Sequence, residues 1–254
     1  MKKKVIGIIP TFNLHDIDND PYQDRASFVT MYINKIKSCG GIPIGLLDKD
    51  IKEYADICDA YLWPGGTKIR HEFYYLLDDA IKNHKKVLGI CLGMQSINTY
   101  FNILEDSKNL NEQDYAKIYE HYKVCNPYLK RLDDDTFHRR HVTKDINTVN
   151  NAKHKINIKK DSLLYKIYKC DTLDVVSLHS SIVSRTSKSI KINAACNEII
   201  EEIEYDDFIL GVQFHPEILE DNELFSWLVK WGKKYARNSR SRNSKKYIKT
   251  YDFK

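Results

Sequence analysis

The chain has 254 residues, of which 42% are hydrophobic, and a formal net charge of +5 at pH 7. That length suits one large α/β domain or two small ones, and no apolar run approaches the length of a bilayer-spanning helix. The six cysteines lack metal-site spacing, and the basic start lacks the long apolar core of a signal peptide. We therefore expect a cytoplasmic protein with free thiols and no membrane partner.

The positive charge is concentrated near the end of the chain. Eight basic residues and no acidic residue lie between Lys233 and Lys249, so removing them from the net of +5 leaves −3 for the rest. We expect residues 233–254 to form a solvated basic tail. Alternatively, the tail contacts nucleic acid or another anion, and the protein would then be a non-catalytic anion-binding protein. No nucleic-acid motif supports that alternative.

The first half of the chain alternates short apolar runs with helical patterns. Strands are predicted at Val5–Ile9, Ile42–Leu47, Ala60–Trp63 and Lys86–Ile90, and helices at Ser27–Cys39, Ile51–Cys58, Glu72–Asn83 and from Met94 onward. This alternation predicts an α/β fold: a doubly wound, mostly parallel sheet with helices on both faces. Ligands of such sheets bind beyond the carboxyl ends of the strands.

Residues 105–151 interrupt the alternation. This polar excursion is expected to border the functional site, with some helix near Glu112–Tyr122, and its His138 and His141 are expected in a solvated loop rather than a metal site. Further strands are predicted at Ile156–Ile158, Thr172–Leu178, Ser189–Ala195, Ile199–Tyr205 and Phe208–Gln213, and a last helix at Asn222–Tyr235. Without a linker-like segment, residues 1–232 are expected to form one domain.

Cys91 follows the strand at Lys86–Ile90, between Gly89 and Gly93. A cysteine between two glycines at a strand-to-helix junction is the pattern of a nucleophile elbow, where crowding excludes side chains at the glycine positions. The start of the following helix favours a thiolate at this place. A buried structural cysteine is the alternative interpretation of this motif alone.

Two further motifs also follow predicted strands. His215-Pro216-Glu217 supplies an imidazole and a carboxylate two residues apart, which suits a base oriented by its neighbour. Gly65-Gly66 lets bare backbone N–H groups approach a bound oxygen, as an oxyanion hole requires. Each motif alone is common, but three strand ends together supply the parts of a cysteine hydrolase.

These motifs resemble the class I glutamine amidotransferase-like superfamily, and within it the γ-glutamyl hydrolases of the C26 peptidase family, typified by γ-glutamyl-γ-aminobutyrate hydrolase. Tyr32–Leu47, Ala195–Ile203 and Ser177-Leu178-His179 add to the resemblance, which spans about residues 3–104 and 152–232. The resemblance implies a flavodoxin-like sheet and hydrolysis of a γ-glutamyl amide through a glutamyl thioester, without a metal or organic cofactor.

The resemblance also implies roles for individual residues. Cys91 would be the nucleophile, His215 the base and Glu217 its partner, and the backbone N–H groups of Gly66 and Leu92 would form the oxyanion hole. The residues expected to bind substrate are Gln95, Gly65, His179 and Ser177.

Several positions depart from the hydrolase pattern and are expected to line the pocket. Leu92 stands where the hydrolases usually have arginine, Lys68 where they have aspartate, Phe101-Asn102 where they have two glycines, and Ser180-Ser181 where they have His-Gln. Leu92 is typical of synthase-linked glutaminases, so a glutaminase subunit that delivers ammonia to a separate synthase is the alternative function. The sequence does not determine which amine is linked to the glutamyl group. It also does not determine whether the protein forms a homodimer.

Overall fold

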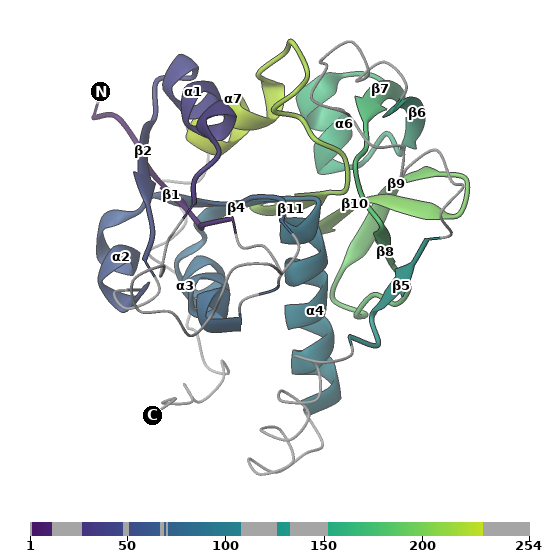
Figure 1. The fold of residues 1–254 in the computed structure, drawn as a ribbon, viewed down its shortest axis with the longest axis horizontal. Coiled ribbons are helices and arrows are strands. Elements are labelled where there is room, and N and C mark those ends of the chain that lie inside the picture. Colours follow the sequence, from purple (N-terminus) through teal and green to yellow (C-terminus); the bar gives the residue numbers. More distant parts are fainter. Residues whose placement is uncertain are drawn as a thin grey trace.

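The structure is a computed structural model that describes residues 2–11, 27–47, 51–66, 69, 71–107, 126–132 and 152–230. Its centre is a nine-stranded sheet in the order β2-β1-β3-β4-β11-β10-β9-β6-β7 (Figure 1). The first five strands in this order run parallel: β2 Ile42–Gly45, β1 Val5–Ile8, β3 Ala60–Trp63, β4 Lys86–Ile90 and β11 Ile209–Val212.

Helices cover both faces of the parallel strands. In Figure 1, α1 (Thr30–Ser38), α6 (Leu163–Tyr168) and α7 (Glu223–Val229) lie above the sheet, and α2 (Ile51–Ile57), α3 (Tyr74–Asn83) and α4 (Leu92–Asp106) lie below it. A short 3₁₀ turn, His71–Phe73, precedes α3. This arrangement confirms the predicted doubly wound α/β fold.

The core consists of two layers because strand side chains alternate between the faces of the sheet. Leu88 and Leu210 point to the layer that includes Phe225 of α7, whereas Val87 and Ile209 point to the layer that includes Met94 and Ile97 of α4 and Leu76 of α3. The parallel strands and both helix layers therefore hold the carboxyl ends of β3, β4 and β11 in fixed positions.

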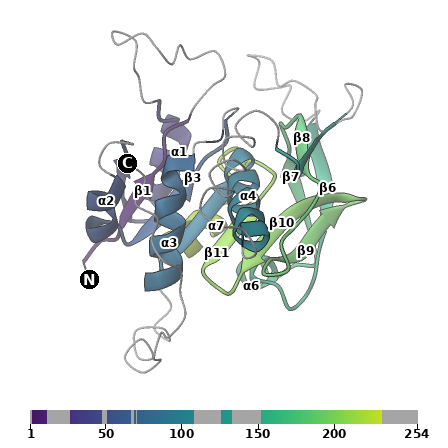
Figure 2. The ribbon, with the colours of Figure 1, turned by 90° about the horizontal axis from the view of Figure 1, so that it is seen from below.

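The strand-rich second half extends the sheet with antiparallel strands, which gather on one side of the molecule in Figure 2. They are β10 Ile199–Tyr205, β9 Lys191–Cys196, β6 Lys153–Ile158 and β7 Thr172–Val176. A separate antiparallel pair joins β5 (Leu129–Arg131) to β8 (Ser181–Val183). The middle of the 105–151 excursion thus contributes a strand, β5, with Tyr128 buried beside it.

The predicted elements agree with the observed ones except at ends and in short segments. Ala60–Trp63, Lys86–Ile90 and Ile199–Tyr205 match, whereas the strand predicted at Thr172–Leu178 ends at Val176. The sequence patterns did not predict α6, β5 or β8, each six residues or fewer. The predicted helix at Glu112–Tyr122, His138, His141, Lys68 and the basic tail lie outside the described residues.

None of the helices in the described part of the chain combines the length and apolar character that crossing a membrane would require.

Candidate active site

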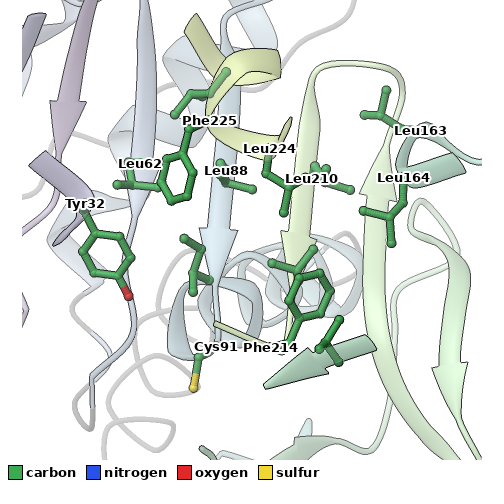
Figure 3. Close-up of a cluster of buried hydrophobic side chains, with 14 of the residues drawn as sticks. Tyr32, Leu62, Leu88, Cys91, Leu163, Leu164, Leu210, Phe214, Leu224 and Phe225 are labelled. Carbon is green, nitrogen blue, oxygen red and sulfur yellow. The ribbon is translucent and has the colours of Figure 1, made fainter. Parts of the chain in front are cut away.

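Cys91 occupies a sharp turn between β4 and α4. Its φ of 52° and ψ of −105° lie outside the regions that residues with a side chain usually adopt, which costs on the order of 1–3 kcal/mol. The surroundings hold this conformation: the Cys91 N–H donates to the Val212 carbonyl at 2.8 Å, and the Cys91 carbonyl accepts the Gln95 N–H at 3.1 Å. In Figure 3 the sulfur points away from the aliphatic cluster above it.

The two glycines of the motif permit α4 to approach the sheet closely. A Cβ at Gly93 would lie 2.0 Å from the Trp63 carbonyl oxygen, and a Cβ at Gly89 would lie 2.5 Å from Cδ1 of Ile97. Both contacts are too short for any side chain, and the first involves backbone. The crowded strand-to-helix turn predicted from Gly-x-Cys-x-Gly is confirmed.

His215 and Glu217 form a pair in the turn after β11. Nδ1 of His215 lies 2.7 Å from Oε1 of Glu217, and both side chains are mostly buried. The His215 N–H donates to the Val176 carbonyl at 2.8 Å, which anchors the turn to β7. Nε2 of His215 makes no hydrogen bond within the described residues, so it is the ring nitrogen left to act on another group.

Gly65 brings the two motifs together. A Cβ on Gly65 would lie 3.1 Å from Cε1 of His215 and 3.6 Å from Cβ of Cys91. Burial disfavours the charged imidazole of His215, but the Glu217 carboxylate and the Cys91 side chain oppose that effect and raise the pKa of His215 well above its usual value. A thiol beside an imidazole that a carboxylate orients is the arrangement of an activated nucleophile.

Tyr32 of α1 completes this cluster, although its sequence position suggested only an apolar helix face. Its hydroxyl donates to Oε1 of Glu217 at 2.8 Å and accepts the Gly65 N–H at 3.5 Å. Burial, followed by the nearby Glu217 carboxylate, raises the pKa of Tyr32 well above its usual value. No sequence signal separates this tyrosine from a core residue, because its partner is 185 positions away.

The backbone N–H groups proposed for an oxyanion hole lie in two of these segments. Leu92 is the first residue of α4, so its N–H has no acceptor within the helix. Gly66 follows Gly65 in the half-buried loop after β3. Both segments border Cys91.

Gln95 and His179 meet at one carbonyl group. Nε2 of Gln95 donates to the Ser181 carbonyl at 2.9 Å and to Oε1 of Gln213 at 3.1 Å, which uses both amide hydrogens. Nδ1 of His179 lies 3.1 Å from the same carbonyl of Ser181 and must carry a proton, since a carbonyl only accepts. Gln213, which the sequence did not single out, therefore fixes the orientation of Gln95.

Ser177 is fully buried at the end of β7. Its N–H donates to the Ala152 carbonyl at 3.2 Å, and its hydroxyl makes no hydrogen bond within the described residues. The preceding residue, Val176, accepts the His215 N–H. Ser177 is thus one residue away from the backbone contact that holds the His215 turn.

The expectation that Phe101-Asn102 lines the pocket is wrong. Phe101 stacks on Tyr205 at 4.7 Å between ring centroids, and the Asn102 side chain donates to the Asn98 carbonyl at 2.8 Å. Both residues are buried in the core, about 15 Å along α4 from Cys91 at 1.5 Å per residue. Among the described residues, no three His, Cys, Asp or Glu side chains are grouped as a metal site would require.

Comparison with known proteins agrees with this architecture. Residues 70–217, more than half of the chain, match the Peptidase C26 family. The glutamine amidotransferase-like protein RP404 of Rickettsia prowazekii is 28% identical over 91% of this chain and 99% of its own length. Protein NtpR of Enterococcus hirae is 25% identical over 78% of this chain and 86% of its own length.

Synthase-linked proteins are also similar. CTP synthase of Thermosipho africanus is 27% identical over 73% of this chain, which corresponds to 38% of that enzyme. The glutaminase domain of Trypanosoma brucei CTP synthase, solved with bound acivicin, shares the fold with a TM-score of 0.59 at 18% identity, over 89% of this chain and 91% of the domain. The chain therefore belongs to the Peptidase C26 family of amide hydrolases, within the class I glutamine amidotransferase-like superfamily.

Proposed function

We propose that the protein hydrolyses the amide bond of a γ-glutamyl compound and releases glutamate and an amine. The observation that carries this proposal is the convergence of Cys91, the His215–Glu217 pair and Gly65 at the carboxyl ends of β4, β11 and β3. Family membership supports amide hydrolysis. The γ-glutamyl specificity rests on the resemblance of the surrounding motifs.

The first half of the reaction forms a thioester. The Cys91 thiolate attacks the γ-carbonyl carbon, and the N–H groups of Gly66 and Leu92 donate to the oxyanion that develops. Nε2–H of His215 then protonates the departing nitrogen as the carbon–nitrogen bond breaks. Glu217, bonded to Nδ1 at 2.7 Å, stabilises the imidazolium during attack and keeps Nε2 directed at the reacting atoms.

The second half returns the enzyme to its starting state. A water molecule gives a proton to Nε2 of His215 and adds to the thioester carbon. The tetrahedral intermediate collapses with cleavage of the carbon–sulfur bond, so glutamate leaves and Cys91 is again a thiolate beside an imidazolium. Protons and electrons balance without a cofactor.

Gln95 is suited to bind the amino-acid end of the glutamyl group. Both of its amide hydrogens are committed to Ser181 and Gln213, so only its carbonyl oxygen is available to a ligand. An acceptor at this place favours the α-ammonium group over the α-carboxylate. Ser177, Gly65 and His179 are the other proposed contacts with substrate.

A glutaminase that supplies ammonia to a separate synthase is the second candidate function. Leu92 at the position after the cysteine favours it, and so does the similarity to CTP synthase. The two functions differ in substrate and in dependence on a partner. A stand-alone hydrolase cleaves γ-glutamyl amines unaided, whereas a glutaminase subunit prefers glutamine and accelerates with its synthase.

The test is to incubate the purified protein with glutamine and with a panel of γ-glutamyl amines and to measure glutamate release. Cys91→Ala should abolish release, and Cys170→Ser should retain it because Cys170 is a half-buried thiol outside the cluster. Turnover of glutamine alone that rises with a synthase partner would favour the second candidate. Full activity of Cys91→Ala would refute the cysteine mechanism in both candidates, whereas no glutamate release by the wild type from any of these substrates would favour the non-catalytic anion-binding alternative.

A further inference from the structure

The hydroxyl of Tyr32 is a polar group on a ring that is buried in an apolar layer. The ring belongs to the layer formed by α1 and α7 over the sheet, among Leu62 and Phe225 (Figure 3). Only 2% of the residue is exposed. A phenylalanine would fill the same space, and a buried hydroxyl costs free energy unless it is hydrogen-bonded. The hydroxyl therefore marks a contact that packing alone does not need.

The hydroxyl bridges two parts of the candidate active site. It donates to Oε1 of Glu217 at 2.8 Å, the oxygen that also accepts from Nδ1 of His215 at 2.7 Å. It accepts the N–H of Gly65 at 3.5 Å. Oε2 of Glu217 makes no hydrogen bond within the described residues, so Tyr32 and His215 are the two described donors that hold this carboxylate.

We propose that Tyr32 is a positioning residue that fixes the Glu217 carboxylate and the Gly65–Gly66 loop relative to each other. The proposal rests on the catalytic roles assigned above to Cys91, His215 and Glu217. A carboxylate with one donor can rotate about that contact, whereas a second donor from helix α1 restrains it. Because the same hydroxyl accepts from Gly65, the base and the oxyanion loop share one anchor.

The contact also bears on charge. With Cys91 as thiolate, His215 as imidazolium and Glu217 as carboxylate, the cluster has a net charge of −1 in a buried place. Proton transfer from the Cys91 thiol to His215 leaves this net charge unchanged, so the amount of thiolate depends on how well the Glu217 carboxylate faces the imidazolium. Without the Tyr32 hydroxyl the carboxylate is held less firmly against Nδ1 of His215. Less thiolate should then form at neutral pH, and every reaction of Cys91 should slow, including reactions that do not involve substrate.

The experiment compares Tyr32→Phe with Tyr168→Phe. Tyr168 is a matched control because it packs against the same layer and donates to Asp221 at 3.3 Å, away from Cys91. The first measurement is the rate constant for alkylation of Cys91 by iodoacetamide at pH 7, followed by peptide mass spectrometry. The second is kcat and KM on γ-glutamyl-p-nitroanilide, after circular dichroism has shown that each variant is folded.

Tyr32→Phe should lower the alkylation rate about fivefold and kcat about tenfold with KM within twofold. Tyr168→Phe should leave all three within twofold of wild type. In a Glu217→Gln background, Tyr32→Phe should cause little further loss, because the hydroxyl acts through the carboxylate. Equal behaviour of the two tyrosine variants, or fully additive losses with Glu217→Gln, would overturn the proposal.

The two readouts separate this inference from the proposed function. If the wild type does not cleave the anilide or any γ-glutamyl amine, the function is wrong, yet the alkylation pattern still supports the positioning role of Tyr32. If hydrolysis depends on Cys91 but Tyr32→Phe reacts like wild type in both assays, the function stands and the positioning role is refuted.

Discussion

Gly93→Ala should both destabilise the protein and displace Cys91, because α4 has no room for a methyl group at this position. The added Cβ would lie 2.0 Å from the Trp63 carbonyl oxygen, whereas ordinary contacts begin at 3.4 Å, so helix and strand must separate by about 1.4 Å. This neighbour is the backbone of the last residue of β3, so it cannot rotate away as a side chain would.

The cost of this separation is about 3 kcal/mol, at the upper end of the usual range for overpacked cores. For a chain of this size that lowers the melting temperature by roughly 6–12 °C. Cys91 is two residues from the methyl group, and a shift of about 1 Å in a reacting atom costs about 100-fold in rate. Gly93→Ala should therefore show both the lower melting temperature and the slower reaction of Cys91.

Gly40→Ala is the control for this prediction. Gly40 has a φ of 86° and no atom within 4 Å of a Cβ built on it, so the substitution strains the backbone by about 1–2 kcal/mol without displacing α4. Urea unfolding and the alkylation rate of Cys91 should show both effects in Gly93→Ala and only a stability loss in Gly40→Ala. Wild-type stability and reactivity of Gly93→Ala would refute the close-packing argument.

Two other substitutions test the buried polar contacts. Gln95→Glu replaces an amide that donates twice by a carboxylate whose oxygens face two other acceptors, the Ser181 carbonyl and Oε1 of Gln213. Urea unfolding should show a free energy of unfolding lower by about 1–3 kcal/mol, and KM should rise at least tenfold. Unchanged values would contradict the assigned orientation of the Gln95 amide. Glu202→Gln should raise the melting temperature at pH 8 more than at pH 5, because burial and the neighbouring Glu204 raise the pKa of Glu202 well above its usual value.

The sign of the Glu202 effect follows from proton binding. The unfolded pKa of a glutamate carboxyl is about 4.3, and the folded pKa of Glu202 is higher. Between these two pKa values the folded state binds more protons than the unfolded state, so the free energy of unfolding falls as the pH rises from the lower value toward the higher one. Glutamine does not ionise and keeps an acceptor for the Asn193 N–H, which Glu202 accepts at 3.0 Å. Melting curves with the same pH slope in both proteins would contradict this assignment.

The sequence was most informative where the chemistry is local. Cys91 and its two glycines, or His215 and Glu217, lie within a few residues of one another, so their spacing alone indicates a turn and a pair. Alternating apolar runs likewise predicted the parallel strands and the helices between them, because buried strands and amphipathic helices differ in period.

Contacts between distant segments were not accessible in this way. Tyr32 looks like one more apolar residue of α1 until α1 is placed against Glu217, and Gln213 looks like an ordinary residue at a strand end until Gln95 of α4 is placed against it. Phe101 was misassigned because its position was judged from a family pattern, whereas ten residues of helix carry it away from Cys91 into the core. The six-residue α6 and three-residue β5 and β8 are too short to show a period.

The most direct test of the account is to detect the covalent intermediate. The protein is mixed with a γ-glutamyl substrate, quenched in acid within the first turnover, digested and examined by mass spectrometry. The account predicts one glutamyl group on the peptide that contains Cys91, absent from Cys91→Ala and strongly reduced in His215→Ala, because His215 also protonates the leaving nitrogen when the thioester forms. Glutamate release that continues unchanged in Cys91→Ala, or a glutamyl group on any other residue, would contradict it.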